Sequence, residues 1–493
     1  ISNFQKEKYF NVELDCDGIP AVKPKIFDPD EAEQLRSRCQ GSEAIVTAVK
    51  ETEKKVKAPK LYDLTTLLRE ANRIYGMTAK QTLDTAQSLY EKKLITYPRT
   101  DSQYLTEDME QTARNVVRQI YEKYQQTGPF DQPEQPDVKK VMNNSKVTDH
   151  HAIIPTMELA SCHLGELKSW EEKILFLIAV HTVMAMSKDH IYQETEIEVE
   201  CQEEIFKAKG KIVLQDGWKL FENCFKNKDR MAIVDPDQEM KERMPKVTQG
   251  QTFYAVAAEK TEHFTSPPKP YSEDTLLAAM ETAGNREFDS ETEKKGLGTP
   301  ATRANIIEKL VSSGYAERKG KQILPTVAGC ELIHVMPENL KSASLTAEWE
   351  NQLLMMEKGK IQEDEFMDGI VSMITEILSV CRAIPEEERN RFQTAREVIG
   401  KCPVCGSDVY EGKTNYYCAD RNCPFALWKA NRFLESMKKS MDKKMAVELL
   451  KKGRTHVKGL YSQKKDSKFD ADLVLGVEDG KARFSLEFPK KKK

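Results

Sequence analysis

The order of strand-like and helix-like patterns along the chain is the feature that most constrains its fold. Apolar and polar residues alternate, as in half-buried strands, at residues 44–49 and again at 195–199 and 253–256. Residues 63–187 instead contain stretches in which apolar residues recur every three or four positions, as they do in amphipathic helices. A second helical region follows at 273–393. This order, β, α, β, α, predicts one β layer that is split by an inserted helical domain.

Composition excludes several classes of protein. Apolar residues make up 39% and charged residues 31% of the 493 residues, which is typical of a globular chain and not of a disordered or fibrous one. The longest apolar run, residues 174–186, contains His181 and is too short to cross a bilayer, so we expect a buried helix and no membrane partner. The chain begins at Ile1 without a leader or an initiator Met, so we expect a fragment without a signal peptide.

Charge is distributed unevenly. From Lys401 onward the chain has 22 Lys and Arg against 12 Asp and Glu, whereas the preceding residues have 53 against 67. A basic end on an acidic body favours a segment that binds a polyanion. The alternative is a lysine-rich tail that is simply solvated.

Four of the eleven cysteines cluster near the end of the chain, at Cys402, Cys405, Cys418 and Cys423. Two, twelve and four residues separate successive members, so two short knuckles would supply four thiolates. Four sulfur ligands favour a structural Zn²⁺ site over a catalytic one. The other seven cysteines are scattered, as expected for reduced, buried thiols of a cytosolic protein.

Aromatic residues run through and beyond this cluster, interleaved with Lys and Arg. Such a mixture suits stacking on unpaired nucleobases along a charged groove. The alternative is that the rings form the small core of the ribbon itself, and we expect about half of them to do so. The rings are Tyr410, Tyr416, Tyr417, Phe425, Trp428 and Phe433.

Residues 94–102, Leu-Ile-Thr-Tyr-Pro-Arg-Thr-Asp-Ser, are the most informative stretch for chemistry. Pro98 disfavours helical geometry at Tyr97, so a helix that ends near Lys93 should lead into an extended segment that presents the phenol. In an extended segment Arg99 points to the same side as Tyr97. A guanidinium there would stabilise a phenolate and hold a phosphate oxygen. The alternative from chemistry alone is a loop tyrosine that packs on proline.

This stretch resembles the active-site signature of type IA DNA topoisomerases, most closely that of the topoisomerase III-like branch. Residues 149–156, Asp-His-His-Ala-Ile-Ile-Pro-Thr, resemble the next signature of that family. Residues 59–64 fit the beginning of its tyrosine domain, residues 267–276 resemble the start of its late helical domain, and residues 296–304 its Gly/Pro-Thr turn. Five motifs therefore occur in the order of the family.

The resemblance implies an isomerase in which Tyr97 attacks a phosphodiester of single-stranded DNA, forms a 5′-phosphotyrosine link and releases a 3′-hydroxyl. The link retains the bond energy, so resealing needs no ATP. Arg99 would hold the scissile phosphate, and His150 would contact the phosphate beside the break. His151 is expected to be structural. Further candidates for DNA or active-site contacts are Thr96, Asp101 and Arg303.

The resemblance also implies an α+β multidomain fold, a type IA topoisomerase-like open ring with an antiparallel β arch, helical domains and a C-terminal zinc ribbon. Local patterns, apart from the resemblance, predict that Asp28 caps a helix that ends near Gln40 and that Thr78 caps a helix of the tyrosine domain. Residues 299–326 have the pattern of a helix and a wing that could bind the DNA backbone, and the alternative is a plain scaffold. The six parts are the first part of the arch (1–58), the helical tyrosine domain (59–190), the second part of the arch (191–260), the helical base (261–393), the four-cysteine ribbon (394–433) and a basic C-terminal topoisomerase module (434–493).

The chain departs from the family pattern in one respect. Family members begin with a domain whose acidic cluster holds Mg²⁺, and nothing here matches that domain. Residues 235–239, Asp-Pro-Asp-Gln-Glu, resemble its acidic signature but lie after the tyrosine among predicted strands, so we interpret them as a hairpin loop. We therefore expect Mg²⁺ for the intact enzyme, with ligands absent from this chain, and a chain that binds single strands but relaxes supercoils poorly.

The expected partners are single-stranded DNA and supercoiled or catenated DNA. We expect a monomer that is cytoplasmic and associated with the nucleoid. One rival hypothesis is a non-catalytic single-stranded DNA-binding remnant of such an enzyme, which Tyr97, Arg99 and His150 argue against. A tyrosine recombinase is a second rival, but recombinases place the nucleophile late in the chain.

Overall fold

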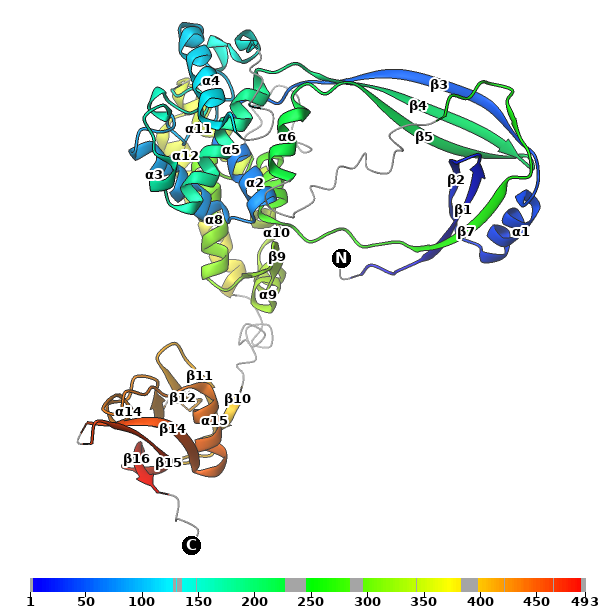
Figure 1. The fold of residues 1–493 in the computed structure, drawn as a ribbon. Helices are drawn as coiled ribbons and strands as arrows, with labels where there is room; N and C mark the ends of the chain where they lie inside the picture. Colours follow the sequence, from blue (N-terminus) through cyan, green and yellow to red (C-terminus); the bar gives the residue numbers. More distant parts are fainter. Residues whose placement is uncertain are drawn as a thin grey trace. The chain divides into compact units, whose positions relative to one another are not determined.

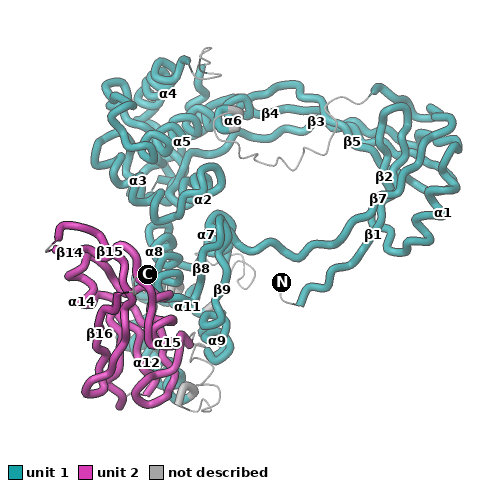
Figure 2. Tube along the Cα trace, turned by 60° about the horizontal axis from the view of Figure 1, so that its bottom comes forward, with its two compact units in different colours: residues 1–382 teal, residues 383–493 magenta. Residues whose placement is uncertain are grey.

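A computed structural model describes most of the protein. The described residues are 3–126, 130, 135–147, 149–226, 245–283, 296–342, 344–382, 398–420, 422–463 and 465–488. They form two compact units, residues 1–382 and 383–493, which are treated separately below (Figure 2). Within the described ranges, every helix is too short or too polar to cross a membrane.

The first unit contains a seven-stranded sheet with the order β6-β3-β4-β5-β2-β1-β7, in which neighbouring strands are antiparallel. Strands β3 and β4 pair from Ile45↔Glu200 to Val56↔His190, although a helical region separates them in sequence. The predicted β layer split by a helical insert is thus confirmed. The strands are β1 (Lys8–Cys16), β2 (Ile19–Ile26), β3 (Ala44–Val56), β4 (His190–Cys201), β5 (Glu204–Gln215), β6 (Thr252–Phe253) and β7 (Ala257–Phe264).

One end of this sheet has a hydrophobic core and the other does not. Strand β1 buries every second residue, and helix α1 (Pro29–Cys39) covers these side chains with Leu35 and its neighbours. Asp28 caps α1 as predicted, because its carboxylate accepts the N–H groups of Asp30 and Glu31. Farther along, β3 is exposed from Lys50 to Val56, and ladder hydrogen bonds and charged cross-strand pairs replace the core. Figure 1 shows β3, β4 and β5 running side by side from this core to the helices.

Residues 253–256 do not form the predicted continuous strand. Strand β6 ends at Phe253, and Ala255 has a φ of 54°. A positive φ is rare for a residue with a side chain and interrupts extended geometry. The chain turns here and resumes as β7 at Ala257, so alternation alone overestimated the strand.

The helical insert surrounds one large core. Its helices are α2 (Leu64–Tyr75), α3 (Ala79–Glu91), α4 (Glu110–Tyr124) and α5 (Ser169–Ala185), with single 3₁₀ turns at Glu107–Met109, Val138–Val141, Asn144–Lys146, Met157–Leu159 and Leu164–Glu166. Helix α6 (Lys219–Lys226) follows β5, in the range predicted as the second part of the arch, but packs Phe221 and Phe225 on the same core. Thr78 caps α3 as predicted. Helix α5 is buried on nearly all sides, which explains its uninterrupted apolar run. His181 lies within it, 2.8 Å from the carbonyl oxygen of Lys60 and stacked on Tyr62.

A second group of helices packs against the insert. Leu64, Leu68 and Leu83 of the insert meet Leu277 and Ile307 in a separate apolar cluster. Helix α8 is followed by a two-stranded hairpin, so the predicted helix and wing are confirmed. The elements are α7 (Glu273–Thr282), α8 (Pro300–Ser312), β8 (Ala316–Lys319), β9 (Gln322–Pro325), α9 (Val327–Val335), α10 (Glu338–Lys341), α11 (Ser344–Glu357) and α12 (Glu363–Arg382).

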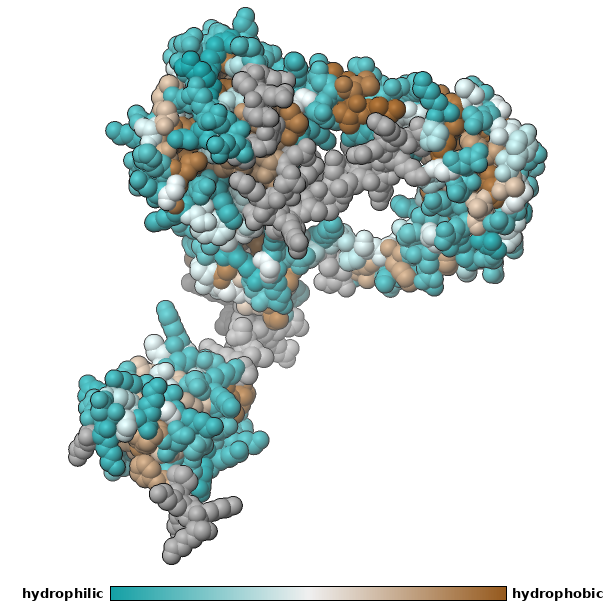
Figure 3. All heavy atoms as spheres, viewed as in Figure 1, coloured by the Kyte–Doolittle hydropathy of each residue, from teal (hydrophilic) through white to brown (hydrophobic). Residues whose placement is uncertain are grey.

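In the described residues of the second unit, two small sheets and two helices surround one core. The predicted ribbon and the predicted C-terminal module share that core, since Val409 and Phe425 of the ribbon pack with Leu449 and Leu473 of the module. Figure 3 shows mainly hydrophilic residues over its visible face. The elements are β10 (Val398–Lys401), β11 (Asp408–Glu411), β12 (Asn415–Cys418), β13 (Ala426–Trp428), α14 (Arg432–Glu435), α15 (Lys443–Lys452), β14 (Arg454–Ser462), β15 (Ser467–Glu478) and β16 (Lys481–Glu487).

Glu171 is a buried carboxylate that ties α5 to α3. Burial opposes its charge, but hydrogen bonds from Lys92 (2.6 Å), Ser88 (2.7 Å) and the Lys168 N–H outweigh burial and lower the pKa of Glu171 to about 2. A carboxyl whose folded-state pKa is depressed stabilises the fold above its ordinary pKa and loses this effect as pH falls through the folded value.

We therefore expect Glu171→Gln to lower the free energy of unfolding of the first unit by about 1.5–3 kcal/mol at pH 7. The difference from the unchanged chain should shrink below pH 4.5 and vanish near pH 2, as followed by thermal unfolding in circular dichroism. Glu122→Gln is the control, because Glu122 forms only an exposed pair with Arg118. Equal effects of the two substitutions at neutral pH would contradict this account.

Candidate active site

Two segments of the insert pair with each other and hold the candidate tyrosine. Ile95 forms an antiparallel bridge with Pro155, and the N–H of Thr96 donates to the Ile154 carbonyl at 3.0 Å. The hydroxyl of Thr96 donates to the Ala152 carbonyl (2.9 Å) and accepts the Ile154 N–H (3.0 Å). The two signature segments of the sequence therefore lie side by side, and Thr96 serves as a structural link between them.

Tyr97 lies between two aromatic rings at this junction. Its ring centroid is 4.3 Å from that of His150, and Tyr90 meets it edge-on at 5.3 Å. Pro98 is buried, which fixes the backbone beside the half-buried Tyr97, whereas Arg99 and His150 are exposed. The tyrosine that the motif predicted to be presented is thus placed next to the predicted histidine.

Thr100 fixes the chain on the other side of Tyr97. It is only 3% exposed, and its hydroxyl donates to the carbonyl of His150 at 2.9 Å. Its own carbonyl accepts the N–H of Leu64, the first residue of α2, at 3.0 Å. The contact between Tyr97 and His150 is therefore set by partly buried hydrogen bonds to the backbone and not by the two side chains alone.

A cavity of 490 Å³ opens beside these residues. Arg99, Asp101 and His150 line one side, and the first residues of α8 line the other. Unpaired backbone N–H groups and the helix dipole make the start of α8 attractive to anions, as are Arg99 and a protonated His150. Asp63, Asp101, Asp149 and Glu281 add negative charge to the same lining. The complete lining is Asp63, Arg99, Thr100, Asp101, Asp149, His150, Glu281, Gly296, Gly298, Thr299, Pro300, Ala301 and Arg303. Tyr97 borders His150 but is not part of this lining.

The turn before α8 needs its glycines. A side chain at Gly296 would lie 2.1 Å from the carbonyl oxygen of Met280, and Gly298 has a φ of 68°. Any larger residue would push the turn away from α7 or strain its backbone. This explains the Gly-Leu-Gly pattern in the sequence.

Arg303 lines the cavity but is largely buried, at 5% exposure. Its Nη1 donates to the hydroxyl of Thr65 at 2.9 Å and its Nε to the carbonyl of Leu297 at 3.2 Å. Burial lowers the pKa of Arg303, while the nearby charges of Glu281 and Asp63 oppose that shift. Arg303 thus joins α8 to α2, and its contact with DNA stays a prediction.

Sequence reasoning missed three residues that the fold brings to this site. Asp63 and Glu281 line the cavity, and burial raises the pKa of Asp63 although Thr66 donates hydrogen bonds to it. Asp63 lies within residues 59–64, which the sequence marked only as the beginning of a domain, and it also caps α2. Tyr90 carries no local signal at all. His151 is half-buried with Nδ1 2.9 Å from the Ala152 carbonyl, in keeping with its expected structural role.

The four clustered cysteines converge in the second unit. Their sulfur atoms all lie within 4.8 Å of one another, with Cys402 and Cys423 3.7 Å apart and Cys405 and Cys418 3.3 Å apart. Four sulfurs at about 2.3 Å from one tetrahedral ion would be about 3.8 Å apart, so the cluster fits a metal ion. No other group of three or more His, Cys, Asp or Glu ligands is found within the described residues.

The aromatic rings around this cluster divide between core and surface. Tyr416 and Phe425 are each 1% exposed and belong to the core. Trp428 is 53% exposed and Phe433 36%. Two of the six rings, fewer than the expected half, thus belong to the core. Tyr410 and Tyr417 are half-buried and meet edge-on, and Trp428 and Phe433 are exposed.

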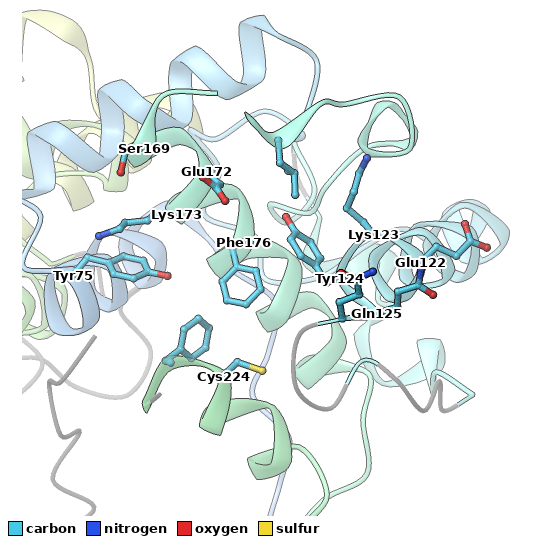
Figure 4. Close-up of a pocket in the computed structure, with 13 residues that line it drawn as sticks. Tyr75, Glu122, Lys123, Tyr124, Gln125, Ser169, Glu172, Lys173, Phe176 and Cys224 are labelled. Atoms are coloured by element: carbon cyan, nitrogen blue, oxygen red, sulfur yellow. The ribbon is translucent and has the colours of Figure 1, made fainter. Parts of the chain in front are cut away.

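A second hollow lies among α4, α5 and α6 (Figure 4). It measures 620 Å³ and is lined by Tyr75, Tyr124 and Phe176 together with charged residues such as Lys123 and Glu172. None of the predicted catalytic or DNA-binding residues lines it, so we assign it no part in the chemistry.

Comparison with known proteins agrees with the motifs. A profile of the DNA topoisomerase family matches residues 1–368. Proteins described as DNA topoisomerase 3 from Bacillus licheniformis and Bacillus subtilis are 35% identical over 450 and 449 residues, which cover 86% of this chain and 59% and 60% of the relatives. The solved structure of full-length topoisomerase I from Thermotoga maritima has a similar fold, with a TM-score of 0.57 at 22% identity over 98% of this chain and 69% of that one.

The split β layer and the tyrosine beside a histidine and an arginine thus agree with the class of type IA DNA topoisomerases. The chain belongs to the DNA topoisomerase family and is similar to its topoisomerase III-like members. It spans about three fifths of the length of the curated relatives that it matches.

The buried contact of Arg303 can be tested through its partner. We expect Thr65→Val to destabilise the first unit by about 1–3 kcal/mol, because it removes an acceptor from a buried guanidinium. Thr85→Val is the control, since the Thr85 hydroxyl is exposed and bonds only to the Gln81 carbonyl of its own helix. Chemical denaturation should separate the two variants, and equal stabilities would show that the contact is dispensable.

Proposed function

We propose that Tyr97 cuts and reseals one strand of DNA as part of a type IA topoisomerase. The observation that carries this proposal is the 4.3 Å packing of Tyr97 on His150 at the edge of a cavity that also holds Arg99 and the start of α8. A phosphodiester in that cavity would meet Arg99 and His150 on one side and the start of α8 on the other, and these groups would have to offset the four carboxylates that also line it. Family membership supports the same activity.

In the proposed step, the Tyr97 oxygen loses its proton and bonds to the phosphorus of one phosphodiester. The bond between phosphorus and the 3′ oxygen breaks, and that oxygen takes up a proton to become a free 3′-hydroxyl. Arg99 would hold a non-bridging phosphate oxygen, and His150 would bind the adjacent phosphate. The reverse attack by the 3′-hydroxyl restores both the strand and the phenol, so no ATP is required.

We further propose that the β arch flexes while a second strand passes through the break. The exposed outer half of β3 supports this, since ladder hydrogen bonds and charged pairs bend at lower cost than a packed core. The partners would be single-stranded DNA and supercoiled or catenated DNA, bound by a monomer that is cytoplasmic and associated with the nucleoid.

Two metals enter the proposal differently. Zn²⁺ held by Cys402, Cys405, Cys418 and Cys423 would stabilise the second unit, and the sulfur spacing supports it. Mg²⁺ is proposed for the intact enzyme, where it would counter charge on the phosphate. We propose that its ligands lie outside this chain; among the described residues, the four cysteines are the one group of three or more candidate metal ligands. Residues 235–239 lie outside the described residues.

The cleavage proposal predicts a covalent product with a defined polarity. A chain extended by an N-terminal metal-binding domain should become attached to the 5′ side of a break in single-stranded DNA, as seen on a denaturing gel with 5′- and 3′-labelled strands. Tyr97→Phe should abolish the adduct completely, and Arg99→Ala should reduce it by at least about tenfold. Tyr104→Phe, in the same segment, should retain it.

Persistence of nicking in Tyr97→Phe would overturn the proposed nucleophile. Strand binding without any adduct in the unchanged chain would instead favour the non-catalytic remnant as the function of this chain.

The zinc proposal predicts about one Zn²⁺ per chain by elemental analysis. Chelation, or Cys418→Ser, should make residues 398–488 sensitive to trypsin while residues 1–382 stay protected, because Cys402 and Cys418 belong to the core of the second unit only. Cys330→Ser is the control, since Cys330 is exposed in the first unit. A metal-free second unit that resists trypsin would refute the assignment.

A further inference from the structure

A buried polar cluster surrounds Glu70 of α2, close to the segments that form the candidate site. The Glu70 carboxylate accepts hydrogen bonds from the hydroxyl of Tyr62 and from the guanidinium of Arg73. His181 of α5 lies 3.5 Å from the same carboxylate, measured from its Nδ1. Tyr62 is 1% exposed and His181 8%. None of these four residues takes part in the proposed cleavage step.

The cluster makes the Tyr62 hydroxyl a donor to a charged acceptor. Burial opposes the charge of Glu70, but the charges of His181 and Arg73 and the hydrogen bond from Tyr62 outweigh burial and hold the pKa of Glu70 below its usual value. Burial and the negative charge of Glu70 raise the pKa of Tyr62 well above its usual value. The phenol therefore keeps its proton, and its hydrogen bond to a carboxylate is stronger than one between neutral groups.

Tyr62 is fixed from two directions. Its ring stacks on that of His181, with centroids 3.6 Å apart and planes 13° apart, and its hydroxyl is held by Glu70. His181 also lies 2.8 Å from the Lys60 carbonyl oxygen through its Nε2. Stacking alone would let the ring slide in its own plane, whereas a hydrogen bond at its tip prevents that movement. Residues 60–62 are thereby anchored to α2 and α5.

The backbone of Tyr62 supports the segment that carries His150. The Tyr62 carbonyl accepts the N–H of Ile153 at 2.8 Å, and the two residues form an antiparallel bridge. The N–H of the next residue, Ile154, donates instead to the hydroxyl of Thr96 at 3.0 Å. Because successive N–H groups of an extended segment point to opposite edges, this segment is held between Tyr62 on one edge and Thr96 on the other.

We propose that Tyr62 and Glu70 position His150 against Tyr97. The bond between the Tyr62 hydroxyl and Glu70 anchors the backbone of Tyr62, and that backbone sets the place of the segment on which His150 lies. Neither Tyr62 nor Glu70 lines the cavity beside Tyr97, so both act through His150. The inference rests on the proposed function for the reaction, but the placement of His150 can be measured in the chain without DNA.

The first test follows the His150 ring by NMR in the full chain with ¹³C-labelled histidine. The signal of its Cε1–H group is sensitive to the Tyr97 ring, whose centroid is 4.3 Å away, and His150→Gln identifies that signal. Tyr62→Phe removes the hydroxyl but keeps the ring that stacks on His181, and we expect it to shift the His150 signal. Glu70→Gln removes the charge of the acceptor and should shift the signal in the same direction by a smaller amount.

The control for this test is Val117→Ala, which removes buried methyl groups from the same hydrophobic core on α4. It should lower the thermal unfolding temperature while leaving the His150 signal in place. An unchanged His150 signal in Tyr62→Phe, or an equal shift in Val117→Ala, would show that the hydroxyl only stabilises the fold and would overturn the proposal.

The second test measures the rate of adduct formation at saturating single-stranded DNA, in the chain extended by an N-terminal metal-binding domain. Tyr62→Phe should lower this rate by about five- to tenfold, with little change in the strand concentration that gives half the maximal rate. In a chain that carries His150→Gln, Tyr62→Phe should have little further effect, because the residue that it positions is gone. An equally large effect in both backgrounds would place the action of Tyr62 elsewhere and refute the inference.

The outcomes separate this inference from the cleavage proposal. If Tyr62→Phe and Glu70→Gln shift the His150 signal but the unchanged chain forms no adduct, the positioning contact stands and the cleavage proposal falls. If the Tyr97 adduct forms but the His150 signal does not respond to either variant, the nucleophile stands and the positioning role falls.

Discussion

The pairing of two loop segments within the helical insert is the constraint on which the candidate site depends. Thr96 and Thr100 each use a hydroxyl to reach the backbone of residues 150–152. Both bonds are partly buried, so breaking one would leave a polar group poorly solvated. They hold Tyr97 against His150 although more than fifty residues separate the two in sequence. The geometry of the candidate site is thus supported by main-chain pairing, which is stiffer than a contact between two exposed side chains.

The same segments connect the tyrosine to the rest of the first unit. The Thr100 carbonyl accepts from the start of α2, and α2 packs on α7 and α8 through Leu64 and Leu68. Arg303 reinforces this interface from α8. The cavity beside Tyr97 therefore exists only while the insert and the later helices remain together, and any movement that separates them would also take the site apart.

The second unit shows how a small domain gains a core. Its four-stranded ribbon is too small to bury much apolar surface, but its inner face packs on α15 and the β14–β16 sheet. Gly400 of β10 leaves room for Leu450 of α15, since an added Cβ would lie 2.7 Å from that side chain. A metal at the cysteine cluster and this shared core would stabilise the same fold, so ribbon and module form one structural unit.

Features encoded by neighbouring residues were predictable from the sequence. Short-range spacing was enough to predict the order of strands and helices, the helix caps Asp28 and Thr78, the helix and wing after residue 300, and the cysteine cluster. Apolar periodicity and helix capping depend only on residues that are close in sequence. The alternation of apolar and polar residues wrongly predicted a continuous strand through Ala255, whose positive φ interrupts the extended backbone. Only the tertiary structure decided that Arg303 is buried, that Asp63 and Glu281 face the cavity, and that Tyr416 is core while Trp428 is surface. These outcomes depend on which elements, distant in sequence, pack together. The spacing of residues within one segment does not determine that packing.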